Sequence, residues 1–107
     1  MFIKTIIVED LFGRKIEIPK ERWKHACIHH PEIEPFIELV KETIESPDFI
    51  KMSSSDKSVR MYYKYFSNVF DGKYILVVIK TNKRNFLLTT YITDYIKAGE
   101  ELWKNKN

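Results

Sequence analysis

Cysteine, glycine and long apolar runs are scarce in this chain. The single cysteine, Cys27, rules out an internal disulfide framework and a cysteine-rich zinc site. There are three glycines, and none forms a glycine-rich phosphate loop or a G-x-S-x-G turn, which argues against nucleotide-cofactor folds. No apolar run approaches the ~18 residues of a membrane span. The N-terminus lacks the basic start and cleavage site of a secretion signal. We therefore expect a cytoplasmic protein with no membrane partner.

The chain has enough apolar side chains to fold, and its length suits one domain. It has 107 residues, of which 44% are hydrophobic and 14% aromatic. A length near 100 favours a single core, so we predict one domain over residues 1–107. Residues 1–47 carry seven basic and nine acidic side chains, whereas residues 48–107 carry eleven and six. The C-terminal part is therefore the better candidate for contact with an anion.

The first half of the chain predicts a β-hairpin followed by two helices. Residues 2–8 and 15–18 have strand-like patterns on either side of a turn that contains Gly13. Residues 20–30 indicate a helix, which Pro31 interrupts because the residue before a proline avoids the helical conformation. A second helix is expected from there through about residue 45. Its apolar stripe consists of Ile33, Phe36, Ile37, Val40 and Ile44.

The second half of the chain predicts strands. Residues 49–52, 59–66, 74–80 and 86–93 are apolar or alternate between polar and apolar. The nearly continuous apolar run at 74–80 is typical of a central strand. The remaining residues are expected to form a tail anchored by Leu102 and Trp103. Helices followed by a run of strands indicate an α+β fold with a mainly antiparallel four-stranded sheet.

The three histidines, His25, His29 and His30, fall within six residues. His25 and His29 have the i, i+4 spacing of a chelating pair, but residues 26–28 are Ala-Cys-Ile, without the glutamate of H-E-x-x-H. We therefore predict no metal site. His30 shares the apolar stripe of the first helix and lies directly before the Pro31 break. Two interpretations stay open: it bonds backbone groups at the break, or it is a general acid or base in a cleft.

Alternation along two strands places polar side chains on common faces. Arg60, Tyr62 and Lys64 share one face of the strand 59–66, and Leu87, Thr89, Tyr91 and Thr93 share one face of the strand 86–93. Lys80 ends the most buried strand, and Lys83 and Arg84 lie in a basic turn. A face of cations, phenols and hydroxyls can hold a phosphodiester. The alternative is the ordinary solvent-exposed face of an antiparallel sheet.

Several segments, in order along nearly the whole chain, resemble a known family. They are Asp10-x-Phe12-Gly13-Arg14, Glu21-Arg22-Trp23-x-His25, His30-Pro31-Glu32, Glu42-Thr43-Ile44-x-x-Pro47-Asp48, Tyr62-Tyr63-Lys64, Val77-Val78-Ile79-Lys80, Thr89-x-Tyr91-x-Thr93 and Lys97-x-Gly99-Glu100-x-Leu102-Trp103. Together they resemble the phage-type nuclease-like members of the Barnase–EndoU–colicin–RelE (BECR) superfamily of metal-independent ribonucleases and toxins. The resemblance implies helices that precede a curved four-stranded antiparallel sheet.

The resemblance also implies a site and a function. Its motif positions fall on His25, His30, Lys64, Thr89 and Tyr91. The chain departs from the family pattern at His29, where arginine is common, and at Thr90, where a small residue is common. The implied function is a metal-independent endoribonuclease or ribonuclease toxin that needs no cofactor. RNA is the implied substrate, and an antitoxin or immunity protein is a possible partner.

Metal-independent RNA cleavage needs a base for the 2′-OH, positive charge for the phosphorane and an acid for the leaving 5′ oxygen. We assign the base or acid to His25 or His30, charge stabilisation to Lys64 and Arg60, and hydrogen bonding to Thr89 and Tyr91. Because His25 and His30 are about 140° apart on a helical wheel, both can reach one phosphate only if the Pro31 break reorients His30.

The alternative function is a non-catalytic module that binds RNA or protein. In that case aromatic side chains stack on bases and basic side chains hold phosphates. The stacking candidates are Tyr62, Tyr63, Tyr65 and Tyr91, and the phosphate-binding candidates are Lys80, Lys83 and Arg84.

Overall fold

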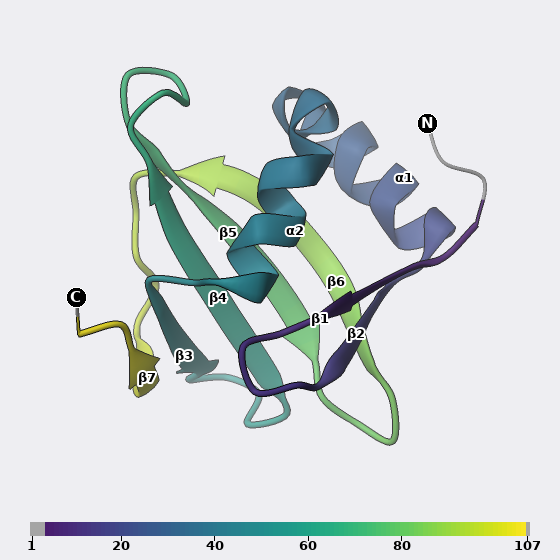
Figure 1. The fold of residues 1–107 in the computed structure, drawn as a ribbon, viewed down its shortest axis with the longest axis vertical. Helices are drawn as coiled ribbons and strands as arrows, with labels where there is room; N and C mark the ends of the chain where they lie inside the picture. Colours follow the sequence, from purple (N-terminus) through teal and green to yellow (C-terminus); the bar gives the residue numbers. More distant parts are fainter. Residues whose placement is uncertain (1–3, 107) are drawn as a thin grey trace.

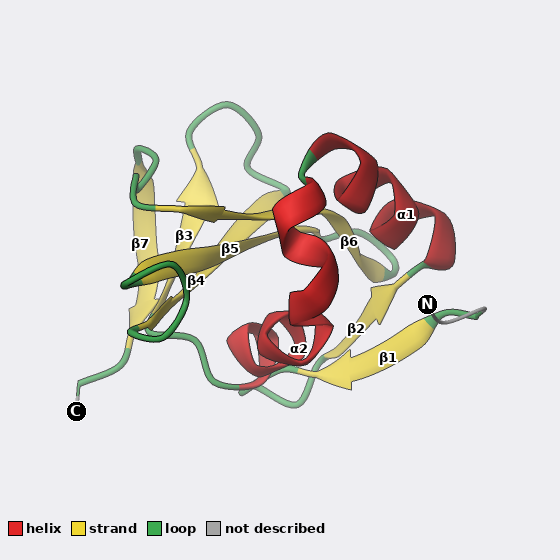
Figure 2. Cartoon of the chain, turned by 90° about the horizontal axis from the view of Figure 1, so that it is seen from above, coloured by secondary structure: helices red, strands yellow, loops and turns green. Residues whose placement is uncertain are grey.

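Residues 4–106, the part of the chain described by the computed structural model, form a seven-stranded sheet with its helices on one side (Figures 1 and 2). The strands are β1 (Ile6–Glu9), β2 (Lys15–Ile18), β3 (Phe49–Ser53), β4 (Val59–Phe66), β5 (Lys73–Lys80), β6 (Asn85–Thr93) and β7 (Gly99–Lys104). The helices are α1 (Lys20–His29), the 3₁₀ helix η1 (Pro31–Phe36) and α2 (Ile37–Glu45). The strand order is β1-β2-β6-β5-β4-β3-β7, so the chain ends supply both sheet edges. The α+β class is therefore confirmed.

The prediction of a four-stranded sheet is wrong, because strands from both ends of the chain join it. The expected four strands, β3 to β6, form an antiparallel meander. The hairpin joins through β2, which runs parallel to the start of β6 with Ile16 opposite Asn85. The expected tail is a strand, β7, which pairs antiparallel with β3. An isolated hairpin is only marginally stable, so its attachment to the larger sheet stabilises it.

The helical region follows the predicted pattern with one difference in its second half. α1 ends at His29, immediately before the break at His30 and Pro31. The second helix starts as six residues of 3₁₀ helix and becomes α-helical only at Ile37. Pro35 lies inside the 3₁₀ stretch, and a proline there lacks the N–H and clashes with the α-helical carbonyl four residues earlier. The predicted stripe still faces the sheet, with Ile33, Val40 and Ile44 fully buried.

The sheet separates two apolar clusters of unequal size. The main core fills the space between helices and sheet and includes Trp23, Ile33, Val40, Ile44, Tyr62, Ile75, Val77, Ile79 and Leu87. On the other side, which we call the open face, Met61, Tyr63 and Leu76 are buried. Half-buried residues surround them: Phe49, Tyr74, Val78, Tyr91 and Ile96. The helices therefore cover one face, and the opposite face has the less enclosed side chains.

The strand faces differ from the predicted ones in two respects. Arg60, Tyr62 and Lys64 share a face as expected, but their partners Ile79, Val77 and Ile75 on β5 place that face against the helices. In β6 the pairing slips, so that Val78 opposes Thr89 whereas Ile79 opposes Leu87. This bulge turns Leu87 into the main core and leaves Thr89 and Tyr91 on the open face. The alternation predicted that Leu87 shares a face with Thr89 and Tyr91. This prediction is wrong, because Leu87 lies on the opposite side of the sheet.

We expect Thr90→Val to lower the free energy of unfolding by about 1 kcal/mol. Thr90 is fully buried, and its hydroxyl donates to the carbonyl oxygen of Leu76 at 2.8 Å. Valine keeps the shape of the side chain and removes the donor. Urea denaturation of the variant measures the effect, with Thr5→Val, at an exposed position, as the control. Equal stability of Thr90→Val and the wild type would contradict this account of the bond.

Candidate functional site

His30 lies where the chain leaves α1 and passes the edge of β6. Its backbone N–H donates to the carbonyl oxygen of Ala26 at 2.7 Å, and its φ of −134° ends the helix before Pro31. Its imidazole stacks on the ring of Tyr91, with centroids 4.6 Å apart and planes inclined by 27°. The imidazole Nδ1 is 3.9 Å from a carboxylate oxygen of Glu32, and the side chain is 35% exposed. The break at Pro31 thus brings a solvent-accessible histidine onto the β6 edge.

Two further polar residues, Thr89 and Lys97, lie near Tyr91 on the open face. Thr89 lies two residues earlier on β6 and points to the same side. The ammonium group of Lys97 is 5.8 Å from the centroid of the Tyr91 ring. The backbone N–H of Lys97 donates to the hydroxyl of Tyr63 at 3.0 Å. We call His30, Thr89, Tyr91 and Lys97 the open-face site.

The environment of Tyr63 keeps its phenol protonated beside this site. Burial raises the pKa of Tyr63, and the hydrogen bond from the N–H of Lys97 lowers it by less. Lys51 donates from its ammonium group to the carbonyl oxygen of Lys97 at 2.9 Å. The chain around Lys97 is therefore held from both sides, which positions its cation above Tyr91.

A hollow of about 330 Å³ adjoins the open-face site. It is lined by Ser53, Ser54, Ser55, Val59, Met61, Val78, Tyr95, Lys97 and Ala98. Val78 is the cross-strand partner of Thr89, and Lys97 belongs to both the site and the hollow. A ligand in this hollow can therefore contact the site on the same side of the sheet.

Lys64 lies on the opposite side of the sheet from Thr89 and Tyr91. Its ammonium group donates to the carbonyl oxygen of Ser46 at 2.8 Å, at the C-terminal end of α2. Carboxylate oxygens of Glu42 and Asp48 are each 4.0 Å away. A cation in this position binds the last carbonyl groups of the helix and is attracted to the negative end of the helix dipole. Lys64 therefore stabilises the end of α2.

His25 lies on the outer side of α1. Its ring is 4.3 Å from that of His29, and both residues are exposed. The described part of the chain brings His30, Thr89 and Tyr91 together, but it does not bring His25 to them.

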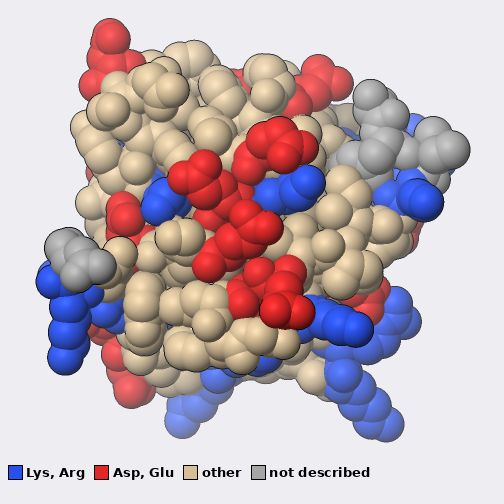
Figure 3. Space-filling view, in the orientation of Figure 1, with Lys and Arg blue, Asp and Glu red and all other residues tan. Residues whose placement is uncertain are grey.

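The basic candidates gather at one end of the sheet, where β5 leads into β6 and β4 begins. Lys80 pairs with Asp56 at 3.0 Å, and the Arg60 guanidinium donates to the carbonyl oxygen of Lys57 at 2.6 Å. The Asp56 pKa falls to about 2, first through hydrogen bonds from Ser58 and then through Lys80. In Figure 3 lysine and arginine side chains project from the lower edge of the molecule, where Figure 1 shows these loops.

Arg84 and Lys83 occupy the loop between β5 and β6. The Arg84 guanidinium donates to both carboxylate oxygens of Glu17, at 2.8 and 2.5 Å. This bond raises the Arg84 pKa and lowers that of Glu17. Lys83 is exposed. Of the two cations in this loop, Arg84 is therefore bound to Glu17, and Lys83 is exposed to solvent.

Tyr62 is enclosed in a buried polar network and does not reach the surface. It is 1% exposed, and its hydroxyl donates to the carboxylate of Asp10 at 2.7 Å. Asp10 also accepts the backbone N–H groups of Phe12 and Arg14, each at 2.9 Å, and the Arg14 guanidinium at 3.0 Å. The phenol is therefore not placed to stack on a base.

The charges in this network follow from its hydrogen bonds. Burial alone would raise the pKa of Asp10, but hydrogen bonds from Tyr62 and from the backbone of Arg14 and Phe12 outweigh burial and lower it. Burial, followed by the bond to Asp10, raises the pKa of Tyr62. The network therefore holds the hairpin turn against β4 through an ionised carboxylate and a protonated phenol.

The helix-covered side of the molecule is acidic. Figure 3 shows this side, and acidic side chains gather at its middle, over α2. The exposed acids of this helix are Glu38, Glu42 and Glu45. Negative charge repels a phosphate backbone, so this cluster disfavours binding of a polyanion over α2.

Residues 4–106 contain neither a metal-binding cluster of acidic, histidine and cysteine side chains nor a membrane-spanning helix. No group of three or more histidine, cysteine, aspartate or glutamate side chains is arranged to hold a metal ion in this range. No helix in the same range is long and apolar enough to cross a membrane.

The fold and site define a small α+β domain with a histidine, hydroxyl groups and a cation on its open sheet face. The phage-Barnase-EndoU-ColicinE5/D-RelE like nuclease 2 family, PBECR2, matches residues 3–106, and the chain belongs to this family. This confirms the resemblance inferred from the sequence and supports a nuclease kind of function. No curated protein matches the chain significantly, and no solved structure does so either.

Sequence reasoning missed Lys97 as a site residue. It lies in the segment between β6 and β7, where no alternating pattern indicates which way a side chain points. The motif Lys97-x-Gly99 was the available signal, because it pairs a cation with a glycine at the start of β7.

Proposed function

We propose that the protein is a metal-independent endoribonuclease that cleaves RNA at the open-face site. The contact between His30 and Tyr91 carries this proposal, because it places an imidazole on an accessible sheet face against a tyrosine ring that the Lys97 ammonium group also approaches. Membership of a nuclease-like family gives the arrangement its expected substrate class, a nucleic acid.

The proposed reaction uses one proton acceptor and two nearby proton donors. The His30 imidazole removes the proton of the 2′-OH, and the 2′ oxygen attacks phosphorus. The 5′ oxygen then leaves with a proton, which the Tyr91 phenol or the Lys97 ammonium group can supply. One acid–base group accelerates such a step by ~10²–10⁴-fold. The products are a 2′,3′-cyclic phosphate and a free 5′-OH, so no water is consumed in this step.

Charge stabilisation of the phosphorane falls to Lys97 in this proposal. Its ammonium group lies on the same ring as His30, whereas Lys64 is on the other side of the sheet. Thr89 supplies a hydroxyl group that can donate a hydrogen bond to a phosphate oxygen. Donors fixed in place before the reaction make a large contribution to catalysis.

A second candidate function, RNA binding without cleavage, is favoured by the aromatic side chains on the same face. Phe49, Tyr63 and Tyr74 form a contiguous group of rings there. Aromatic platforms bind single-stranded RNA with little sequence preference. This function requires the same face but no contribution from the His30 imidazole to chemistry.

A 2′-O-methyl RNA oligonucleotide tests where RNA binds, because it lacks the attacking hydroxyl and stays intact. We expect it to shift the backbone amide resonances of His30, Tyr91 and residues 95–98. The amides of α2 should not move. Shifts confined to α2 would contradict the proposed site, and the absence of any shift would contradict RNA as the substrate.

Lys83→Ala is expected to weaken RNA binding mainly at low salt. Lys83 is exposed in the basic loop, and a lysine that contacts one phosphate contributes about 1 to the slope of log K against log salt. Filter-binding measurements across a salt series give this slope. The matched control is Lys24→Ala, since Lys24 is also exposed but lies on α1. An unchanged slope for Lys83→Ala would place the RNA elsewhere.

A further inference from the structure

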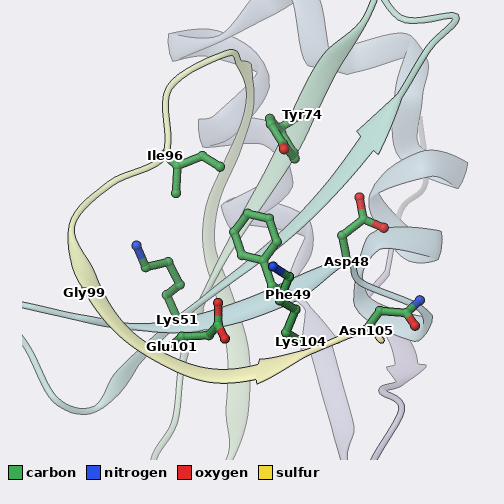
Figure 4. Close-up of a pocket in the computed structure, with 9 residues that line it drawn as sticks. All are labelled: Asp48, Phe49, Lys51, Tyr74, Ile96, Gly99, Glu101, Lys104 and Asn105. Carbon is green, nitrogen blue, oxygen red and sulfur yellow. The ribbon is translucent and has the colours of Figure 1, made fainter. Parts of the chain in front are cut away.

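A second recess on the open face has the chemistry of a nucleotide site. It encloses about 500 Å³ between β3 and the chain from residue 96 to residue 105 (Figure 4). This volume lies within the ~300–1,000 Å³ usual for small-molecule sites. We propose that the recess binds one base of the RNA together with an adjoining phosphate, away from the bond that is cut. This inference rests on the proposed function.

The floor of the recess is aromatic. Phe49 stacks on Tyr63, with centroids 4.9 Å apart, and meets Tyr74 edge to face at 5.8 Å. Tyr63 is fully buried, whereas Phe49 and Tyr74 are half-buried and line the recess. Figure 4 shows the Phe49 ring in the middle of the recess, with Tyr74 beyond it. A planar base can therefore stack there, and ring stacking is the main attraction for unpaired bases.

Strand β7 contributes one carboxylate and one ammonium group to the rim, in addition to Asp48 and Lys51. The pairing of β3 with β7 slips between Ile50 and Lys51, so that Phe49 opposes Lys104 and Lys51 opposes Glu101. This shift places Glu101 and Lys104 on the same side of the sheet, where both side chains extend toward the recess (Figure 4).

These two side chains are available to a ligand. Within residues 4–106 neither Glu101 nor Lys104 forms a hydrogen bond or an ion pair with another side chain. A carboxylate accepts N–H groups of a base, and an ammonium group binds phosphate. The N–H groups of a base and the oxygens of a phosphate are therefore complementary to Glu101 and Lys104.

The wall of the recess is fixed in advance of binding. Gly99 starts β7, and a Cβ at this position would collide with the carbonyl oxygen of Met52. The glycine therefore lets β7 approach β3 closely. The bond from Lys51 to the carbonyl oxygen of Lys97 holds the preceding segment. A preformed site loses less entropy on binding.

One cross-strand row connects the recess to the open-face site. Phe49 opposes Tyr63, Tyr63 opposes Leu76, and Leu76 opposes Tyr91. Three strand spacings of ~4.8 Å separate Phe49 from Tyr91 by ~14 Å. A short run of unstacked nucleotides bridges this distance, passing over the segment whose Lys97 N–H binds Tyr63. The recess therefore suits a base a few nucleotides from the one next to His30.

The test uses the 5′-monophosphates of adenosine, guanosine, cytidine and uridine, titrated separately and followed by amide chemical shifts. At least one nucleotide should shift the amide resonances of Phe49, Gly99 and Glu101, and the shifts should saturate. Phe49→Leu keeps an apolar side chain but removes the stacking face, and it should weaken binding about tenfold or more. Phe70→Leu is its control, because Phe70 is exposed in the loop after β4. If no monophosphate shifts these amides, or if Phe49→Leu binds as the wild type does, the proposal is overturned.

A second pair of variants tests the phosphate contact without touching the aromatic floor. Lys104→Ala should weaken binding of the monophosphate severalfold and leave binding of the matching nucleoside unchanged. Lys106→Ala, just beyond β7, should change the affinity for neither. Equal binding of the monophosphate to Lys104→Ala and the wild type would overturn the phosphate part.

The outcomes separate this inference from the proposed function. Nucleotide binding at the recess in a protein that does not cut RNA supports the nucleotide site and overturns the nuclease. RNA cleavage that depends on His30, without nucleotide binding at the recess, overturns only the recess.

Discussion

His30→Ala should reduce the rate of RNA cleavage at least ~100-fold, because it removes the one imidazole on the open-face site. Its effect on folding should be small. The side chain is 35% exposed and its principal contact is the stack on Tyr91, so the loss of unfolding free energy is about 1 kcal/mol. The single-turnover cleavage rate and urea denaturation measure the two effects.

The matched controls are the two histidines of α1, which precede His30 in the sequence. His29 is adjacent in sequence but exposed on the outer side, so His29→Ala should cleave RNA at the wild-type rate. His25→Ala should do the same, because His25 is exposed and its ring lies against that of His29. A loss in His25→Ala as large as that in His30→Ala would move the chemistry to the outer side of α1. Full activity of His30→Ala would remove His30 from the mechanism.

Asp10→Ala should lower the free energy of unfolding by about 2–4 kcal/mol. The variant leaves the buried hydroxyl of Tyr62 and the N–H groups of Phe12 and Arg14 without their acceptor. Breaking a fully buried charge pair costs ~3–5 kcal/mol, and the lower range applies because the Arg14 side chain is 41% exposed and regains water. Urea denaturation measures the change. Glu9→Ala, at an exposed position on β1, should change stability by less than ~0.5 kcal/mol.

The same network makes stability depend on pH in a definite direction. The pKa of Asp10 is lowered in the folded state, so its contribution is complete above the unfolded pKa of about 3.9 and disappears as the pH falls through the folded value. Asp10→Asn should therefore differ most from the wild type at neutral pH and least in acid. A constant difference from pH 7 to pH 2 would show that the charge of Asp10 is not what stabilises the turn.

The sequence pattern predicts strands that have one buried side. It does not predict strands or sheet contacts that depend on pairing with a distant segment. Residues 59–66 alternate and residues 74–80 are nearly all apolar, and both ranges lie within strands, β4 and β5. β7 escaped prediction because its sequence, GEELWK, begins with two acids after the glycine and is mostly exposed. The attachment of β2 to β6 depends on residues about 70 positions apart, which local patterns do not encode.

Only part of the site can be predicted from the sequence, again because local patterns do not show which elements pack together. Alternation shows which side chains share a face, but it does not show which face the helices cover. Lys64 and Tyr62 were therefore grouped correctly with Arg60 and assigned to an open surface, whereas the helices cover that side. His30 and Tyr91 are predicted both from their places in the helix and strand patterns and from the family motifs. Their contact depends on the chain break at Pro31.

The central claim is that the purified protein cuts RNA through its own side chains. The direct measurement is incubation with mixed RNA in excess EDTA, followed by analysis of the new ends. We predict cleavage in EDTA with 2′,3′-cyclic phosphate and 5′-OH ends, and its loss in His30→Ala. Cleavage that appears only after a divalent metal is added, or that leaves 5′-phosphate ends, would contradict the mechanism.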